Sequence, residues 1–101
     1  MRSTTEVMFT EFEWDDAKRL SNIDKHGIDF ADAAEALLRP HLEQQSDRNG
    51  EARILAICEA TRRIIAVAYT LRDSRCRIIS ARPARSYEQK KFRQIFGERD
   101  S

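Results

Sequence analysis

The sequence predicts an α+β domain in which two helices in the N-terminal half come before an antiparallel sheet of about four to five strands, and a third helix follows the sheet. Two early segments repeat apolar residues at helical spacing, and later segments are short apolar runs separated by polar turns. Strands joined by two to four residues must be antiparallel, because a parallel return needs a long crossover. The chain has 101 residues, of which 41% are hydrophobic, and this suits one core. We expect one domain over residues 9–97.

The N-terminal segment, residues 1–8, is polar and without pattern, so we expect a disordered tail there. Phe9–Trp14 then alternates apolar and polar residues, which predicts a short strand. Asp15 follows as the expected N-cap of the first helix, because its carboxylate can accept hydrogen bonds from the first free backbone amides.

Two amphipathic helices are expected next. The first should end at Gly27, which can adopt the left-handed conformation that often closes a helix. The second begins near Asp29 and repeats apolar residues at i, i+3, i+4, i+7 and i+8, as a helix that faces a core does. Pro40 ends it, because proline cannot continue helical hydrogen bonding. The two apolar stripes consist of Ala17, Leu20 and Ile23, and of Phe30, Ala33, Ala34, Leu37 and Leu38.

Strands follow from residue 41 onward. His41–Gln45 is a weak candidate, whereas Ile54–Ala60 and Ile64–Leu71 are strongly apolar. The second of these runs is apolar on both faces, as is typical of a central strand covered on each side. A last strand, Cys76–Ala81, is expected to end before Pro83, which cannot donate a ladder hydrogen bond.

A final helix is predicted from about Tyr87 to Phe96, with Gly97 as its end. Ser86 and Gln89 have the Ser-x-x-Gln spacing of a capping box, in which each side chain bonds the backbone amide of the other residue.

Several classes of protein are excluded by composition. No run approaches the roughly 18 apolar residues that span a membrane, and the N-terminus lacks the apolar centre of a signal peptide. We therefore expect a cytoplasmic protein with no membrane contact. Cys58 and Cys76 each lie in an apolar run rather than in a metal-binding cluster, and we expect both to be reduced thiols in the core. No metal and no cofactor are expected.

The net charge of +1 hides an asymmetry along the chain. Residues 1–71 contain 9 basic and 13 acidic side chains, whereas residues 72–101 contain 9 basic and 4 acidic ones. The C-terminal third is therefore a candidate surface for binding phosphate groups. The alternative is that these basic side chains are simply solvated strand edges and helix faces.

A series of short motifs in the sequence resembles the BrnT toxin family, a group of RelE-like ribonuclease toxins. The order and spacing of the motifs carry the resemblance, since each motif alone is a weak signal. They are Phe12-Glu13-Trp14-Asp15 with Lys18; Asn22 with Lys25-His26-Gly27; Phe30 and Ala33; Gly50-Glu51 with Arg53; Tyr69-Thr70; and Arg77-Ile78-Ile79-Ser80-Ala81-Arg82 with Ala84 and Glu88.

The resemblance implies a RelE-like fold and a metal-independent endoribonuclease that arrests translation and growth. It also implies a cognate ribbon-helix-helix antitoxin, similar to the BrnA proteins, that neutralises the toxin and is alone responsible for any contact with operator DNA. RNA would then be the substrate.

Cleavage of RNA without a metal needs a base for the 2′-hydroxyl, cations for the phosphorane and an acid for the leaving 5′-oxygen. His26 is the first candidate for proton transfer, because both of its protonation states exist near neutral pH, and Lys25 lies beside it. The alternative for His26 is a purely structural role at a helix C-terminus, where a cation is favourable. Glu51 is a possible base, although it can equally be the ion-pair partner of Arg53, two residues further along the same strand face.

The arginines are candidates for binding phosphate, because a guanidinium matches two phosphate oxygens at once. We assign Arg53 and Arg82 to the catalytic centre, and Arg77 and Arg85 to RNA binding. Strict alternation places Arg77 and Arg82 on opposite faces of the last strand, so they can share a site only if a twist, bulge or strand end redirects one of them. As a residue at an exposed strand end, Arg82 is expected to add little to stability.

Tyr69 is a further candidate for RNA binding by stacking on a base, but a tyrosine in a central strand is more often part of the core. His41 is expected at the surface. The sequence thus predicts a ribonuclease toxin, and the alternative is a non-catalytic module that binds RNA or protein through the same basic surface.

Overall fold

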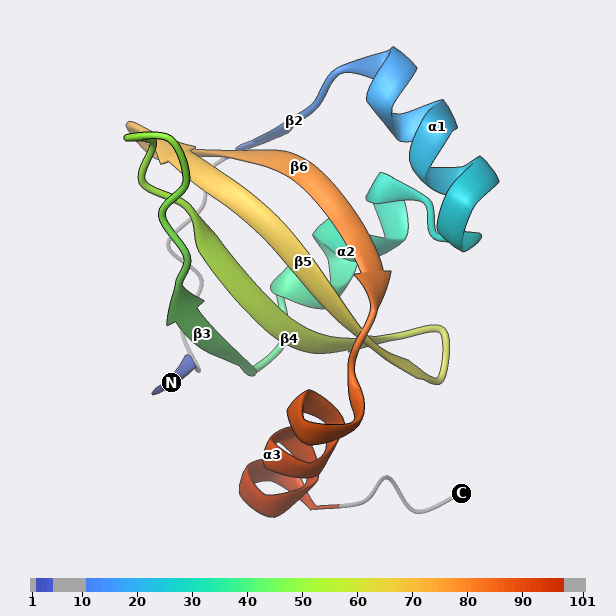
Figure 1. The fold of residues 1–101 in the computed structure, drawn as a ribbon, viewed down its shortest axis with the longest axis vertical. Helices are drawn as coiled ribbons and strands as arrows, with labels where there is room; N and C mark the ends of the chain where they lie inside the picture. Colours follow the sequence, from blue (N-terminus) through green and yellow to red (C-terminus); the bar gives the residue numbers. More distant parts are fainter. Residues whose placement is uncertain (1, 5–10, 98–101) are drawn as a thin grey trace.

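The computed structural model describes residues 2–4 and 11–97. These residues form six strands and three helices (Figure 1), and a sheet, two N-terminal helices and one C-terminal helix are found as predicted. The elements are β1 (Arg2–Thr4), β2 (Glu11–Glu13), α1 (Asp16–His26), α2 (Phe30–Leu37), β3 (His41–Gln45), β4 (Ile54–Ala60), β5 (Arg63–Arg72), β6 (Arg75–Pro83) and α3 (Ser86–Phe96).

The strand order in the sheet is β1-β3-β4-β5-β6-β2. All neighbours are antiparallel except β2 and β6, which run parallel. The long connection through both helices makes this parallel pairing possible, and the sequence did not predict it. Arg2–Thr4 pairs with β3, although no strand was expected there. The rest of the expected tail, residues 1 and 5–8, and the first two residues of the expected strand at Phe9–Trp14 lie outside the described residues.

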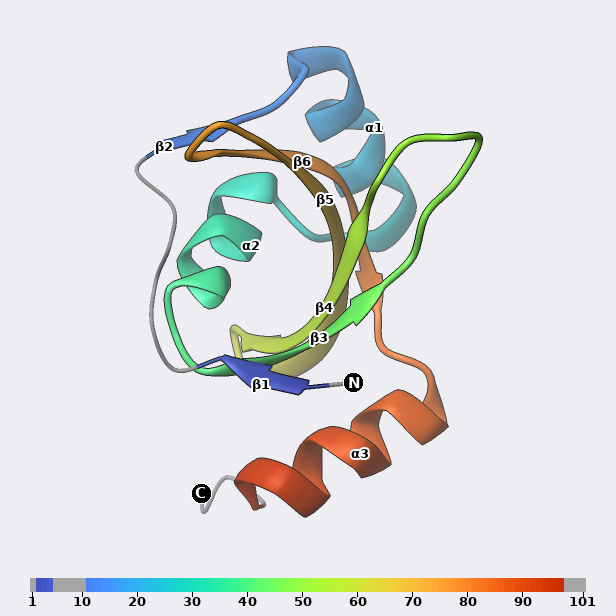
Figure 2. The same cartoon turned by 90° about the vertical axis from the view of Figure 1, so that its left-hand side faces the viewer.

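The sheet curves around α2, and α3 lies against its outer face (Figure 2). The larger core fills the space between α2 and the inner face, where Phe30, Leu37, Val67 and Ile78 are almost fully buried. A smaller core under α3 contains Leu42, Ile57, Ala66, Ala84 and Phe92. Because α3 is short, it covers only part of the outer face (Figure 1).

The predicted start and end of α1 and the predicted start of α2 are confirmed, whereas α2 ends at Leu37, before Pro40. Asp15 is the N-cap of α1 and accepts a hydrogen bond from the Lys18 amide at 3.1 Å. Gly27 closes α1 with a φ of 68°, a conformation that glycine adopts without steric cost. Asp29 caps α2 through the Ala31 amide at 3.0 Å.

The predicted capping box of α3 is wrong. Arg85, not Ser86, is the N-cap, and its amide donates to Glu88 Oε1 at 2.7 Å. Glu88 is almost fully buried. Its carboxylate, rather than the side chains of Ser86 and Gln89, accepts the hydrogen bond from a free backbone amide at the start of α3.

Asn22 fixes α1 against the edge of β6. Its Nδ2 donates to the carbonyl oxygens of Ala81 at 2.8 Å and of Ile28 at 2.9 Å, and its Oδ1 accepts from the Ala81 amide at 3.1 Å. Since β2 pairs only with residues 75–77 of β6, the Asn22 amide takes the place of a neighbouring strand at Ala81. The side chain is buried.

We predict that Asn22→Ala lowers the free energy of unfolding by about 2–4 kcal/mol, because it leaves buried backbone groups of Ala81 and Ile28 without partners. Ser21→Ala, at an exposed position of the same helix, is the control and should change stability by less than about 0.5 kcal/mol. Urea unfolding followed by the fluorescence of Trp14, whose ring packs edge-on against Phe30, measures both. Equal stability of the two variants would contradict the assignment.

Candidate functional site

A bulge in β6 decides which of its side chains share a face. Ala68 of β5 pairs with Ser80, but the next residue, Tyr69, pairs with Ile78. Ile79 is therefore an extra residue, and it reverses the alternation of side chains along β6. As a result Arg77, Ser80 and Arg82 share the outer face.

The inner face receives Cys76, Ile78 and Ala81 from the same strand, and all three are buried in the larger core. The bulge thus removes the obstacle that strict alternation raised, because Arg77 and Arg82 do not lie on opposite faces.

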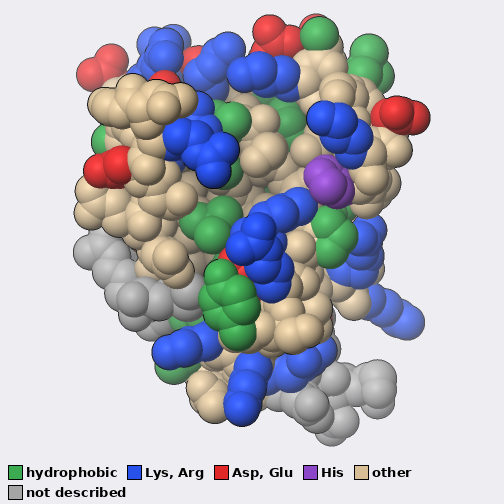
Figure 3. Space-filling model, in the orientation of Figure 1, with side chains coloured by type: hydrophobic (Ala, Val, Ile, Leu, Met, Phe, Trp, Pro, Cys, Tyr) green, Lys and Arg blue, Asp and Glu red, His purple; other side chains and the backbone are tan. Residues whose placement is uncertain are grey.

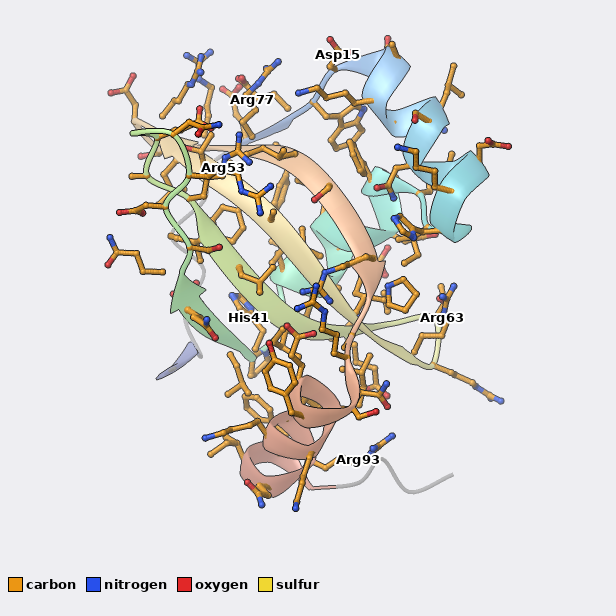
Figure 4. All side chains as sticks on the ribbon, in the orientation of Figure 1. Asp15, His41, Arg53, Arg63, Arg77 and Arg93 are labelled. Atoms are coloured by element: carbon orange, nitrogen blue, oxygen red, sulfur yellow. The ribbon has the colours of Figure 1, made fainter. Side chains whose placement is uncertain are left out.

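Arg53 belongs to the same outer face. It lies two residues before Leu55, which packs against the smaller core under α3, so alternation directs both side chains outward. Figure 4 shows Arg53 and Arg77 near the same end of the sheet. We call the surface formed by Arg53, Arg77 and Arg82 around Ala68 and Ser80 the arginine face. Basic side chains are spread over this side of the molecule, with a hollow of uncharged atoms between them (Figure 3).

Arg53 is held by Glu51. Its Nε donates to Glu51 Oε1 at 2.7 Å, and this hydrogen bond lowers the pKa of the Glu51 carboxyl group. The ion-pair role that the sequence suggested for Glu51 is therefore present. Beside Arg53 lies a groove of about 660 Å³, lined in part by Gln44, Asp47 and Thr70.

Arg77 is held by Glu13 of β2. Its Nη1 donates to Glu13 Oε2 at 2.9 Å, and Arg75 Nε lies 3.7 Å from the other oxygen of the same carboxylate. The parallel pairing of β2 with β6 brings these residues together, because it sets Glu13 opposite Arg77 in the register.

Arg82 makes a two-pronged ion pair with Glu88 of α3. Its Nη1 and Nη2 donate to the two carboxylate oxygens at 2.9 and 3.0 Å, and Nη1 also donates to the Pro83 carbonyl at 3.1 Å. Glu88 is 1% exposed and Arg82 is 26% exposed. The expectation that Arg82 is an exposed strand-end residue of little structural importance is therefore wrong, since its guanidinium neutralises a buried carboxylate.

The electrostatics of Glu88 reflect this pairing. Burial alone would raise its pKa, but the hydrogen bonds from Arg82 and from the Arg85 amide outweigh burial, so the pKa of Glu88 lies below its ordinary value. The carboxylate is therefore charged at neutral pH, and its two oxygens orient the guanidinium group of Arg82. The sequence contained Glu88 in the family motif but gave no sign of this contact.

Lys25 and His26 form the last turn of α1. His26 lies one helical turn after Asn22, and Asn22 bonds Ala81, the neighbour of Arg82. The C-terminal turn of α1 is thus next to the end of β6 that carries Arg82 (Figure 1). Lys25 is exposed, His26 is half-buried, and the Arg85 side chain is exposed at the start of α3. These residues flank Arg82, whereas Glu51 and Arg53 lie near Arg77.

Tyr69 does not join the arginine face. It is 1% exposed, lies on the inner face, and its hydroxyl donates to Glu43 Oε2 at 2.9 Å. The core role that the sequence favoured is the one observed. His41 is not at the surface as expected, because its ring is buried and contacts the same carboxylate oxygen of Glu43 at 3.1 Å.

Both cysteines are buried in the larger core as free thiols, and burial raises the pKa of each to about 12. Over residues 2–4 and 11–97, no group of three or more histidine, cysteine, aspartate or glutamate side chains is arranged to hold a metal ion. Nor does any helix in this part of the chain have the length and apolar character needed to cross a membrane.

The comparison with protein families matches residues 14–88 to a family model described as "Ribonuclease toxin, BrnT, of type II toxin-antitoxin system". The match extends from the end of β2 into the first turn of α3 and includes Lys25, His26, Arg53, Arg77 and Arg82. Comparison with curated proteins gives no match.

We predict that Arg82→Ala lowers the free energy of unfolding by about 2–4 kcal/mol, because it leaves the Glu88 carboxylate buried without a cation. The double variant Arg82→Ala with Glu88→Gln should be more stable than Arg82→Ala alone, since it removes the buried charge. Urea unfolding at neutral pH measures the three proteins, and additive losses in the double variant would contradict the ion pair.

The acid dependence provides a control for this prediction. A carboxyl group whose pKa is lowered by folding stabilises the protein above its unfolded pKa, about 4.3 for glutamate, and loses this contribution as the pH falls through the folded pKa. Wild-type stability should therefore fall more steeply below about pH 4 than that of Glu88→Gln.

Proposed function

This chain belongs to the BrnT family of ribonuclease toxins of type II toxin-antitoxin systems, and from that premise we propose that it cleaves RNA on the arginine face. The observation that carries the proposal is the bulge at Ile79, which brings Arg77 and Arg82 onto the same face as Arg53. Three guanidinium groups from β6 and from the entry of β4 thus lie on one face, along which an RNA strand can bind.

In the proposed reaction the 2′-hydroxyl of the RNA attacks the phosphorus of the adjacent 3′-phosphate without the help of a metal ion. A base takes the 2′-proton, the bond to the 5′-oxygen breaks, and an acid protonates that oxygen as it leaves. Arg53, Arg77 and Arg82 stabilise the extra negative charge of the phosphorane. Each is already oriented by a carboxylate, so little reorganisation accompanies the reaction.

We assign proton transfer to His26, with Lys25 beside it as an electrostatic or proton-transferring group. This assignment is supported by the position of the last turn of α1 next to the Arg82 end of β6. Glu51 is a weaker candidate for the base, because its hydrogen bond to Arg53 lowers its pKa and makes it a poor proton acceptor near neutral pH. Arg85, exposed beside Arg82, is proposed to bind the RNA backbone.

We further propose that the antitoxin is a ribbon-helix-helix protein that covers the arginine face with acidic side chains, and that unopposed cleavage in the cytoplasm arrests translation. Arginine forks buried under a partner are costly unless they meet anionic groups. A complex whose interface leaves Arg53, Arg77 and Arg85 exposed would contradict this assignment.

We predict that Arg77→Ala lowers the rate of RNA cleavage about 10²- to 10³-fold, the effect of losing one preorganised donor to the transition state. Arg77→Lys keeps the charge but loses the two-pronged geometry, so it should recover only part of the rate. Single-turnover cleavage of a defined RNA measures both. Lys91→Ala, at an exposed position of α3, is the matched control, and a fully active Arg77→Ala would remove Arg77 from the site.

We predict that His26→Ala changes the pH dependence of cleavage as well as its rate. If the imidazole transfers a proton, the rate profile of the wild type has a limb that reports this transfer, and the variant lacks it. Single-turnover rates from pH 5 to pH 8 measure this. A His26→Ala protein with the same limb as the wild type would restrict His26 to a structural role.

A further inference from the structure

A second basic concavity lies beside the arginine face, between α3, the turn that joins β4 to β5, and the chain before β3. Its volume is about 640 Å³. Four arginines form its rim and apolar side chains form its floor. We call it the arginine groove and define it by Arg39, Arg62, Arg63, Arg93, Ile64 and Phe96. Figure 4 shows Arg63 beside the turn between β4 and β5 and Arg93 on α3 below it.

The charge of the groove is strongly positive. Glu59 is the acidic residue in its lining, against four guanidinium groups. Arg39 donates to the backbone carbonyl of Glu59, and Arg93 donates to Gln89 at 3.3 Å. The side chains of Arg62 and Arg63 are exposed and make no hydrogen bond or ion pair with the rest of the described chain. Two forks are thus available to an anionic ligand.

The turn that presents Arg62 is held in an unfavourable backbone conformation. Ala60 pairs with Arg63 across a two-residue turn, and both turn residues have positive φ, 48° for Thr61 and 65° for Arg62. Asn-Gly is the preferred pair for such a turn, whereas a β-branched residue and a long side chain are disfavoured. Residues kept in such conformations are found preferentially at functional positions, so the turn points to a use for the Arg62 side chain.

We propose that the arginine groove binds the sugar–phosphate backbone of RNA away from the bond that is cut. This proposal rests on the proposed function. The groove is continuous with the arginine face, because Pro83 lines the groove and directly follows Arg82. Planar guanidinium forks chelate phosphate oxygens in pairs, and a half-apolar floor of Ile64 and Phe96 suits ribose and base.

The geometry sets a minimum length for the RNA. Arg77 and Pro83 pair with Thr70 and Ile65, which are five residues apart on β5, and this corresponds to about 17 Å at roughly 3.3 Å per residue. An RNA that reaches from the arginine face into the groove must therefore be several nucleotides long. Short RNAs occupy the arginine face alone, and longer ones engage both surfaces.

The test uses two single-stranded 2′-O-methyl RNAs, of 4 and 16 nucleotides, which lack the attacking hydroxyl and so report binding without cleavage. Fluorescence anisotropy compares the wild type with Arg63→Ser/Arg93→Ser and with Lys91→Ser as the control. Lys91 is on the same helix but does not line the groove. We expect the double variant to bind the 16-mer at least about 10-fold more weakly and the 4-mer unchanged. The slope of log K against log salt should fall by about 0.7 for each lost phosphate contact.

A second variant separates binding from folding. Thr61→Asn/Arg62→Gly replaces the strained turn by the preferred pair, so its melting temperature should rise by about 4 °C while its affinity for the 16-mer falls. Equal affinity of all variants for the 16-mer overturns the proposal. The proposal is also overturned if a poly-glutamate peptide binds through Arg63 and Arg93 and the RNA does not, since the groove would then bind carboxylates rather than phosphates.

Cleavage assays with unmodified RNA distinguish this inference from the proposed function. If the wild type cuts neither length, the proposed function fails, whereas the binding measurements still decide the role of the groove. If the double variant cuts the short RNA at the wild-type rate and has a raised KM for the long RNA, both stand. An unchanged KM for the long RNA overturns the groove alone.

Discussion

In β6, the extra residue Ile79 allows one strand to serve two purposes that strict alternation would set against each other. The strand gives apolar side chains to the core on both sides of the bulge, and it also gives Arg77 and Arg82 to the outer face. Without the bulge, correct burial of Ile78 would turn Arg82 toward α2. The sheet register, the core and the candidate site therefore all depend on this one irregularity. Bulges are common beside functional surfaces, where they redirect side chains.

The three arginines of that face are each paired with a glutamate from another position in the chain: Glu51 with Arg53, Glu13 with Arg77 and Glu88 with Arg82. Such pairs hold the forks in fixed directions before a ligand arrives. The glutamates also compete with a ligand for the guanidinium groups, because a phosphate must either share each arginine with its carboxylate or displace that carboxylate. The cost of displacement differs among the pairs, since Glu88 is buried and cannot be left without its cation, whereas Glu51 is exposed enough to be hydrated.

Local features of this fold could be predicted from the sequence, and features that depend on distant contacts could not. Asp15, Gly27 and Asp29 act on backbone groups within a few residues, so their capping roles follow from residue type alone. The parallel pairing of β2 with β6, by contrast, joins residues more than sixty positions apart. Glu88 was expected only as part of a motif, because nothing local shows that its carboxylate turns inward to Arg82. The family motifs identified the arginines, but the bulge that unites them became visible only in the register.

The amide of Asn22 has a consequence for how this molecule meets other copies of itself. An open strand edge is a template on which a strand of another chain can be added, and proteins protect such edges to avoid aggregation. Beyond the short pairing with β2, the edge of β6 offers Ala81 as such a template, but both of its backbone groups are already bonded to Asn22. A single side chain from a helix thus closes this edge of the sheet at Ala81, so that a strand of another chain cannot be added there.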